Sequence, residues 1–410
     1  MRLLMIAPGT RGDVAPMAGL GQKLALHGFD VSIAANPAYK DLAVSAGCRF
    51  RELPGDMGAL VKPAAPGAKA SPKDLRRYLR ELRDYFELAA TGTMAAAERG
   101  ADIIMTNAVA PYAYDVAEAM GIPAIGAHLQ PIEPSAAYSP MALGASRSFG
   151  PLGNKLLGQL FAASKAPYDL PAKRVRESLG LPARSRIASE RLRRQHRSPI
   201  LHGFSSVIVP RSADWHEGIV NCGYWWPPAD PAWTPSQRLL DFIDEGPAPV
   251  FIGFGSTQAL EPDFITDVAR RTGRRTIVQG EPEIDEPGIL GIGAVPHHWL
   301  FPQMAAVVHH AGAGTTAAGL RAGVPAVPVP VFTDQPFWAQ RIHRLGAAAE
   351  PIAYKHLTAQ RLASSITGVL ANEDLADGAR RIARQLAAET DSSIPVIRIL
   401  EQLGARHRPS

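Results

Sequence analysis

The sequence has few cysteines, no long apolar run and no leader-like start. Cys48 and Cys222 are the two cysteines in 410 residues, which excludes a disulfide framework or a cysteine-based metal site and fits a reducing cytoplasm. No apolar run reaches about 18 residues, so no transmembrane helix is expected. The opening segment, MRLLMIAPGTRGD, is too briefly apolar for a signal peptide, and we interpret it as a first buried strand. The composition therefore predicts a cytoplasmic globular protein.

Further absences limit the ligands. The loop Gly9-Thr10-Arg11-Gly12-Asp13 lacks the G-x-G-x-x-G spacing of a dinucleotide site, which disfavours NAD. A net charge of +5 allows an anionic partner, but no RNP, zinc-finger or basic-zipper pattern supports nucleic-acid binding. Part of the positive charge is an arginine cluster in 184–197, which is either a solvated surface or a patch for peripheral contact with an anionic membrane.

Short apolar strands alternate with helical stretches in both halves of the chain. This alternation predicts an α/β protein with two doubly wound parallel sheets, each with helices on both faces. A proline-rich break after Gly223 marks the interdomain linker, which we place at 226–240. The first domain is then 1–225 and the second 241–388. The strands expected are Leu3–Ala7, Val31–Ala35, Ile103–Thr106 and Ala124–Ala127, then Val250–Phe254, Thr276–Val278, Ala306–Val308 and Ala326–Val329.

The most informative segment runs from His309 to Trp338. An apolar strand ends in two histidines, and a small-residue turn, 311–314, leads into a helix that begins near Thr315. The turn lets a ligand approach the backbone through Gly312 and Gly314, and the free N–H groups of the helix favour an anion. His310 is nearer the turn than His309 and is better placed to reach a phosphate.

Downstream of that helix, Asp334 and Gln335 follow a second strand and are suited to bind several hydroxyls. Phosphate and polyol recognition in one crevice indicates a nucleotide-sugar site. Two further loops follow strands, where ligands bind in open α/β sheets. Ser256 lies in one of them, and Thr10 and Gly12 lie in the other, as candidates for phosphate contact.

Asp13 has two possible roles. On residue type alone, an N-cap carboxylate for a helix from Val14 is favoured. The alternative is a general base facing the interdomain cleft. The two roles compete, because a strongly capping carboxylate is a weaker base.

Four segments carry a family resemblance over nearly the whole chain. They are GTRGDVAP, HGFSSVIVPRSADWHEGIVNCGYWW, PVFIGFGST and the run GAVPHHWLFPQMAAVVHHAGAGTTAAGLRAGVPAVPVPVFTDQPFWAQRIHRLG. The last resembles the donor-binding segment of family 1 glycosyltransferases with the GT-B fold. The chain is most similar to the branch of sterol glucosyltransferases and antibiotic glycosyltransferases.

The resemblance implies two Rossmann-like domains facing a cleft, with the acceptor on the first and the nucleotide sugar on the second. It implies an inverting transferase without a metal or other cofactor, and no D-x-D triplet is present. The last segment, 389–410, would form a helix that crosses back to the first domain. The family's diphosphate contacts match His310, Gly314 and Thr315, with Ser256 adjoining, and its sugar contacts match Asp334 and Gln335.

In the resembled members Asp13 corresponds to the proposed base, which favours catalysis over capping. The base-stacking tryptophan of plant members is replaced by 293–296, so we expect base recognition by backbone contact at Val295. The acceptor pocket is expected to be apolar with few polar anchors, shaped by loops around Met57, Phe86, His128, Gln130 and Met141.

The expected function is transfer of a hexose to a hydroxyl of a hydrophobic small molecule such as a sterol, macrolide or polyketide. UDP-glucose is the favoured donor because Asp334 and Gln335 suit a fully hydroxylated hexose, with a TDP-deoxysugar as the alternative. Two other classes stay open: a nucleotide-sugar epimerase, and a non-catalytic nucleotide-sugar or lipid-binding protein.

Overall fold

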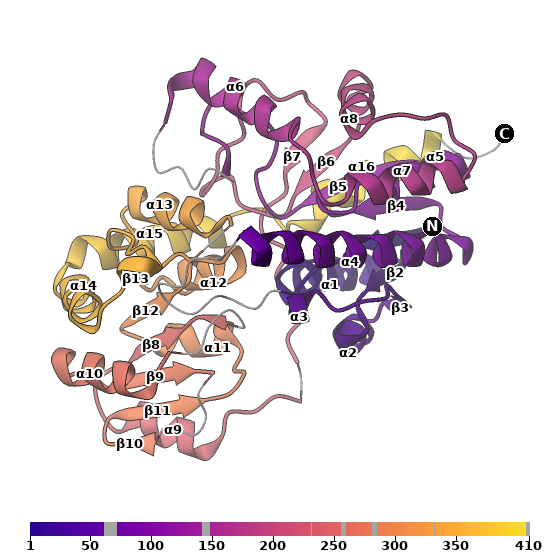
Figure 1. Cartoon of the computed structure of the whole chain (residues 1–410). Helices are drawn as coiled ribbons and strands as arrows, with labels where there is room; N and C mark the ends of the chain where they lie inside the picture. Colours follow the sequence, from indigo (N-terminus) through magenta and orange to yellow (C-terminus); the bar gives the residue numbers. More distant parts are fainter. Residues whose placement is uncertain are drawn as a thin grey trace.

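The chain folds around two parallel sheets, shown in Figure 1. This computed structural model describes residues 1–60, 72–141, 148–230, 232–255, 260–280, 285–331 and 333–406. The two sheets confirm the expected architecture of two Rossmann-like domains.

The first sheet has seven strands, all parallel, in the order β3-β2-β1-β4-β5-β6-β7. Its central strands are almost completely buried because helices cover both faces, which is why they are apolar along their whole length. The bounds are β1 Arg2–Ile6, β2 Asp30–Ala35, β3 Arg49–Glu52, β4 Ile103–Thr106, β5 Ala124–His128, β6 Ile200–His202 and β7 Ile219–Asn221.

The second sheet has the order β10-β11-β9-β8-β12-β13, and all of it is parallel except the edge strand β10. The bounds are β8 Val250–Gly253, β9 Thr276–Gln279, β10 Asp285–Glu286, β11 Ile289–Ile292, β12 Ala306–His309 and β13 Ala326–Pro328. The sequence predicted the central strands of both sheets within a residue or two. It missed the short strands β3, β6, β7, β10 and β11.

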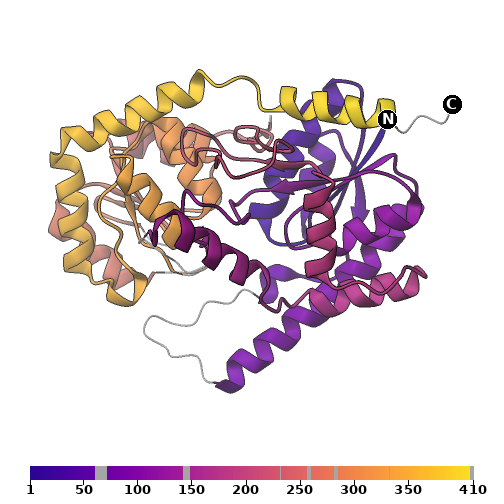
Figure 2. The same cartoon turned by 90° about the horizontal axis from the view of Figure 1, so that it is seen from above.

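Helices cover both sheets (Figures 1 and 2). Those of the first half are α1 Arg11–Leu26, α2 Lys40–Ser45, α3 Met57–Leu60, α4 Pro72–Glu98, α5 Tyr112–Met120, α6 Gly150–Ala162, α7 Asp169–Ser178 and α8 Arg186–Gln195. Those of the second half are α9 Gln237–Asp244, α10 Pro262–Thr272, α11 His297–Leu300, α12 Ala313–Ala322, α13 Gln335–Arg344, α14 Ala359–Ala371, α15 Glu373–Ala387 and α16 Ser393–Arg406.

Two helices begin earlier than the sequence predicts. Helix α1 begins at Arg11 rather than Val14, with Thr10 at the N-cap position, so Asp13 lies in the first turn and is not the N-cap. Helix α12 begins at Ala313 rather than near Thr315, with Gly312 at its N-cap position. Thr10 and Gly312, the two N-cap residues, have extended backbone, and threonine and glycine are both favoured at this position.

The segment between the sheets and the last helix both pack on α1. The backbone of Trp226 lies so close to Gly19 that a Cβ there would be 1.8 Å from the Trp226 carbonyl oxygen. The linker was expected at 226–240, but helix α9 begins at Gln237, so the last residues of that segment are helical. Val396 and Leu400 of α16 join the core of the first domain, and Lys23 of α1 forms an ion pair with Asp391 at 2.9 Å. Figure 2 shows α16 beside the N-terminal half.

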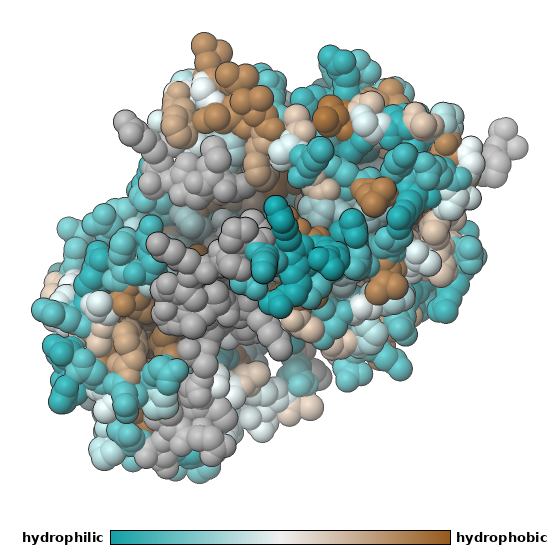
Figure 3. Space-filling view, viewed as in Figure 1, coloured by the Kyte–Doolittle hydropathy of each residue, from teal (hydrophilic) through white to brown (hydrophobic). Residues whose placement is uncertain are grey.

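The surface of the first domain has one apolar and one basic feature. Apolar side chains gather over α6, seen as brown in the upper part of Figure 3; Leu152, Leu156 and Leu160 are exposed along it. In the arginine cluster, Arg184 pairs with Glu118, and Arg186 pairs with Asp169 and Glu190. Within the described ranges, no helix combines the length and the apolar character needed to cross a bilayer.

Candidate functional site

A cavity of about 2070 Å³ lies between the two domains. The carboxyl ends of parallel strands from both sheets point at it, which is where open α/β sheets bind ligands. It is bounded by the loop after β1, the ends of β4 and β5, and the loops after β8, β12 and β13. Of the residues selected from the sequence, it brings together Thr10, Gly12, Asp13, Met57, Phe86, His128, Gln130, Met141, Val295, His310, Gly312, Gly314, Thr315, Asp334 and Gln335. Ser256 lies outside the described residues.

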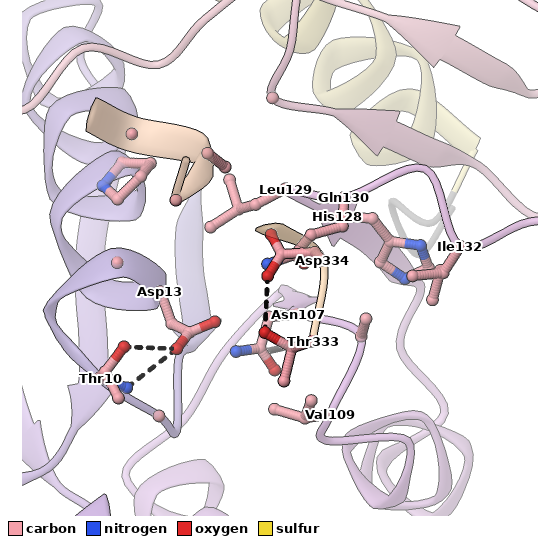
Figure 4. A pocket seen from close by; sticks show the side chains of 18 of the residues that line it. Thr10, Asp13, Asn107, Val109, His128, Leu129, Gln130, Ile132, Thr333 and Asp334 are labelled. Atoms are coloured by element: carbon pink, nitrogen blue, oxygen red, sulfur yellow. Dashed lines mark hydrogen bonds between the residues drawn. The ribbon is translucent and has the colours of Figure 1, made fainter. Parts of the chain in front are cut away.

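Asp13 uses one carboxylate oxygen for its own helix and leaves the other facing the cavity. The backbone N–H of Thr10 donates to Oδ2 at 2.9 Å, and the Thr10 hydroxyl donates to the same oxygen at 3.3 Å. Oδ1 has no hydrogen bond within the described part of the chain. Figure 4 shows Asp13 and Asp334 directed into the same space from opposite domains. Capping and base chemistry therefore need not compete, because they occupy different oxygens.

The loop before Asp13 is built around that side chain. Gly9 has φ +134°, and a Cβ there would lie 2.3 Å from Asp13 Oδ2, so no larger residue fits. The Gly9 N–H donates to the Tyr85 hydroxyl at 2.9 Å, and that hydroxyl donates to Asn36 Oδ1 at 2.8 Å. These buried hydrogen bonds connect the loop to α4 and hold the start of α1, which carries Asp13, in place.

The surroundings make Asp13 a weaker acid than a free aspartate. Burial raises its pKa to about 6, the Thr10 hydrogen bonds oppose the shift, and the negative charge of Asp334 adds to it. Although half-buried, Asp13 has one oxygen on the cavity. A carboxylate with a pKa near the working pH is suited to accept a proton.

On the other wall, the turn before α12 adopts a conformation that demands small residues. Ala311 has φ +62°, and its N–H donates to His309 Nδ1 at 3.0 Å. A Cβ at Gly312 would lie 2.4 Å from His310 Nε2, so the His310 ring lies directly against the start of α12. His309 is 1% exposed, packs in the interior and does not line the cavity, whereas His310 does.

The first turn of α12 presents free donors to the cavity. The N–H of Thr316 is the first that bonds within the helix, to the Gly312 carbonyl. Those of Ala313, Gly314 and Thr315 have no acceptor among the described residues, as expected at a helix start. Gly314 is exposed, and nothing lies within 4 Å of where its Cβ would be. An anion can therefore approach the positive end of the helix.

The histidines beside this turn are neutral. Burial lowers the pKa of His310 to about 4, and burial together with the charge of His310 lowers that of His309 to about 3. His310 Nδ1 is buried without a hydrogen-bond partner in the described structure. An unpaired buried nitrogen at the mouth of the helix costs free energy that a ligand would recover.

Asp334 and Gln335 stand at the start of α13 on the same wall. Asp334 accepts from Trp338 Nε1 at 2.8 Å and from the Thr333 hydroxyl at 2.9 Å, while Gln335 Oε1 accepts from the Val331 N–H at 2.8 Å. Thr333 has φ +55°, so this corner is held in a strained conformation. Burial raises the pKa of Asp334. Each carboxylate oxygen keeps a lone pair for a ligand hydroxyl.

Beyond α12 the cavity continues to a pocket bounded by the segment 293–298. Val295 lines it, as expected, together with His297, whose Nε2 is 3.1 Å from Gln279 Oε1. Burial lowers the pKa of His297 to about 4, and its ring stacks on Phe301. A neutral part of the cavity with exposed residues at Gly293 and Ala294 leaves backbone groups available to a planar base.

The first-domain wall is mainly apolar. Met57 and Phe86 belong to the buried cluster between α4 and the first sheet, and both reach the cavity. Met141 packs against a buried cluster that contains residues of both domains. His128 and Gln130 follow β5 and supply polar atoms on this wall.

Sequence reasoning missed two features of this wall. Asn107, 4% exposed at the end of β4, donates from Nδ2 to the Pro8 carbonyl, while its Oδ1 has no partner in the described chain. Glu133 hydrogen-bonds His128 and His202, and these three form the one group among the described residues that could hold a metal ion. The sequence carries no signal for these two residues, because Asn107 bonds to Pro8 across 99 positions and Glu133 to His202 across 69.

Comparison with known proteins agrees with this geometry. A family model described as "Erythromycin biosynthesis protein CIII-like, C-terminal domain" matches residues 282–403. A model for pancreatic hormone peptide also matches 60–91, a short stretch that includes part of the amphipathic helix α4.

The chain is 33% identical to the O-mycaminosyltylonolide 6-deoxyallosyltransferase of Streptomyces fradiae, over 95% of this chain and 94% of that protein. It is 30% identical to a sterol 3-beta-glucosyltransferase of Cryptococcus neoformans, over 95% of this chain but only 26% of that protein.

Solved structures share the fold. The glycosyltransferase VinC in complex with DTDP aligns with a TM-score of 0.67 at 20% identity, covering 99% of this chain and 100% of that one. The spinosyn forosaminyltransferase SpnP aligns with a TM-score of 0.71 at 16% identity, covering 99% of each. The chain belongs to the family 1 glycosyltransferases with the GT-B fold, in the branch of sterol glucosyltransferases and antibiotic glycosyltransferases.

Proposed function

We propose that this glycosyltransferase moves a hexose from a nucleoside diphosphate sugar to a hydroxyl of a hydrophobic small molecule, with inversion. The observation that carries the proposal is the cavity itself: the unpaired oxygen of Asp13 faces the donor wall formed by α12 and Asp334. A sterol, macrolide or polyketide is the class of acceptor that an apolar wall suits.

In the proposed reaction, Asp13 Oδ1 accepts the proton of the acceptor hydroxyl. The oxygen attacks the anomeric carbon, and the bond from that carbon to the diphosphate breaks on the opposite face. The electron pair leaves with the diphosphate, whose charge is stabilised by the N–H groups of Ala313, Gly314 and Thr315 and by His310. Asp334 and Gln335 hold the sugar hydroxyls.

UDP-glucose is the donor proposed first. The remaining lone pairs of Asp334 suit the hydroxyls of an unmodified hexose, and a deoxysugar would leave one of them unpaired. A TDP-deoxysugar is the second candidate, because the Streptomyces fradiae relative, named a deoxyallosyltransferase, matches this chain along nearly its full length. Base recognition is proposed to use the backbone at Val295 and the pocket around His297.

The reaction is proposed to need no metal. The sequence lacks a D-x-D triplet, and the α12 start offers the positive potential that a metal would otherwise supply. A chelator should therefore leave the initial rate unchanged, and a large loss of rate that added Mg²⁺ or Mn²⁺ restores would contradict this part of the proposal.

A cytoplasmic protein with peripheral contact to a membrane fits the proposed acceptor class. The exposed leucines of α6 support this, since Phe161 at the end of the same helix is exposed and also lines the cavity. Co-sedimentation with anionic vesicles tests the contact, and full recovery in the supernatant would contradict it.

The experiment that tests the function is a matrix of UDP- and TDP-sugars against hydrophobic alcohols, read by mass spectrometry. Appearance of a hexosylated alcohol supports the proposal, and the donor that gives most product identifies the base and sugar. Conversion of the donor sugar without a glycosylated product would favour an epimerase. Nucleotide binding with neither reaction would favour a binding protein.

A further inference from the structure

Three polar side chains form a hydrogen-bonded row in the acceptor wall that the proposed transfer does not use. Glu133 accepts from His128 Nδ1 at 2.5 Å with Oε1 and from His202 Nε2 at 2.7 Å with Oε2. His202 Nδ1 lies 2.9 Å from Asn221 Oδ1. His202 is completely buried and stacks on Phe204, whereas His128 borders the cavity.

The partners of His202 determine its charge. Asn221 Nδ2 donates to the Val209 carbonyl at 2.8 Å, which orients the amide so that its oxygen faces His202. Both ring nitrogens of His202 therefore face oxygens that only accept, and both must carry a proton. Burial raises the pKa of Glu133, but its interactions with the two histidines outweigh burial and hold that pKa well below its usual range. Glu133 and His202 thus form a buried ion pair.

The same bonds fix the tautomer of His128. One carboxylate balances one imidazolium, and a second imidazolium would leave an uncompensated buried charge. His128 therefore holds a single proton, on the Nδ1 that donates to Glu133. Its Nε2 carries a lone pair and acts as an acceptor.

Nε2 lies beside the Tyr114 hydroxyl at the edge of the cavity, and we call the part of the cavity next to these two polar atoms the niche. Both atoms pack closely on the main chain of Gly126, where a Cβ would lie 3.0 Å from His128 Nε2 and 2.8 Å from the Tyr114 hydroxyl, so no side chain fits there. Tyr114 and His128 both line the cavity, and no hydrogen bond joins them among the described residues. Burial raises the pKa of Tyr114 to about 12, so it offers a neutral hydroxyl that can donate. An acceptor and a donor side by side complement one alcohol group, which donates once and accepts once.

We propose that this niche binds a second hydroxyl of the acceptor, so that the preferred substrates are hydrophobic diols or polyols rather than simple alcohols. The hydroxyl donates to His128 Nε2 and accepts from Tyr114, while Glu133 and His202 are positioning residues. The inference rests on the proposed function, since it assigns specificity to the acceptor side of the same cavity.

The protonation pattern is tested first, without any substrate. Long-range ¹H–¹⁵N NMR of the ring nitrogens should show His202 with two protonated nitrogens and His128 protonated only on Nδ1, as their hydrogen-bond partners require. Glu133→Gln should abolish the doubly protonated His202, because the balancing charge is gone. A neutral His202, or a His128 protonated on Nε2, would overturn the inference.

Binding and transfer are then compared for hydrophobic diols of different hydroxyl spacing, such as decane-1,10-diol and androstane-3β,17β-diol, each paired with its mono-alcohol. For at least one pair, the wild type should favour the diol in acceptor KM by about tenfold or more, since losing the hydroxyl leaves buried groups unpaired. His128→Phe and Tyr114→Phe should remove the preference, so that the diol and its mono-alcohol have similar KM values. His27→Phe, at an exposed histidine at the end of α1, is the matched control.

The outcomes separate this inference from the proposed function. Transfer to alcohols with no diol preference in any pair, or a preference that His128→Phe leaves intact, overturns the niche and keeps the transferase. If no alcohol is glycosylated, the proposed function fails instead. Binding at the niche is then tested by titrating the protein with the diols and following the ¹⁵N signal of His128 Nε2. If this signal does not shift with any diol, the proposed binding at the niche is wrong.

Discussion

The two walls of the cavity are built on different principles. The second-domain wall offers mainly backbone groups: free N–H groups at the start of α12 and strained turns at Ala311 and Thr333, beside neutral histidines whose pKa values burial depresses. The first-domain wall offers side chains: apolar ones from several elements, together with Asp13, Asn107, His128 and charged residues such as Glu190 and Arg193. On the proposed function, a diphosphate would be recognised by groups of the main chain, whereas a hydrophobic acceptor would be recognised by the shape of the cavity.

This difference explains why the walls should respond differently to substitution. Changes on the first-domain wall should affect proton transfer and acceptor choice and leave nucleotide affinity intact. Changes at the start of α12 should do the reverse. A variant on either wall that changes the transfer rate and the nucleotide affinity equally would contradict this difference between the walls.

The largest effect is expected at Asp13. Asp13→Asn keeps an oxygen that can accept from Thr10, so the helix start should survive while the base is lost. Transfer should fall by about 10²–10⁴-fold, the usual contribution of general-base assistance, with nucleotide affinity near that of the wild type. Initial rates by mass spectrometry and calorimetric titration with UDP and TDP measure the two quantities. Activity within a few-fold of wild type would mean that Asp13 only caps α1.

The next effect is expected at Gly314, on the opposite wall. Gly314→Ala adds a methyl group at an exposed position where the diphosphate is proposed to lie, and no protein atom is within 4 Å of it. Nucleotide affinity should drop by roughly 10- to 100-fold, equivalent to losing one or two hydrogen bonds to a charged group. The melting temperature should stay or rise, because alanine favours a helix over glycine.

The matched control for that variant is Gly368→Ala in α14, an exposed helical glycine that also has nothing within 4 Å of its Cβ position. It should gain similar stability without any change in nucleotide binding. Unchanged nucleotide affinity in Gly314→Ala would remove the start of α12 from the donor site.

A smaller effect is expected from pH. Because the base must be ionised, and burial raises the pKa of Asp13 to about 6, kcat/KM should be maximal above pH 7. Below about pH 6 it should fall tenfold per unit as the carboxylate is protonated. A bound diphosphate adds negative charge, so the apparent pKa of kcat should exceed that of kcat/KM. In Asp13→Asn the residual rate should lack this step; a step that remains there must come from another group.

The smallest effect is expected at Tyr85, which supports Asp13 from a distance. Tyr85→Phe leaves the buried Gly9 N–H without its acceptor, so the free energy of unfolding should fall by about 1–3 kcal/mol. Transfer should fall only a few-fold, because Asp13 itself is untouched. Tyr112→Phe is the control: its hydroxyl is buried and unpaired in the described structure, so removing it should not destabilise the protein. Thermal unfolding of the two variants side by side makes the comparison.

The sequence predicts the donor wall better than the acceptor wall for the same reason. A turn that must adopt positive φ and let a ligand reach the backbone restricts its residues to small ones, so 311–314 can be recognised in the sequence. The central strands were equally visible because burial on both faces makes them wholly apolar. The edge strands β3, β7 and β10 lack this pattern, and the inner strands β6 and β11 are only three and four residues long; all five were missed.

The acceptor wall depends on contacts between residues far apart in the chain. Glu133 and His202 are separated by 69 positions, and Tyr85 reaches Gly9 across 76. The two roles weighed for Asp13 from the sequence assumed that the whole carboxylate has one task. Only the structure shows that its two oxygens face different partners.

The central claim is that the start of α12 binds the diphosphate without a divalent ion. A crystal structure with UDP or TDP, grown in the presence of a chelator, tests this most directly. We expect phosphate oxygens within hydrogen-bond distance of the N–H groups of Gly314 and Thr315 and of the His310 ring. A nucleotide bound elsewhere, or one with no ordered diphosphate until a metal is supplied, would contradict the account.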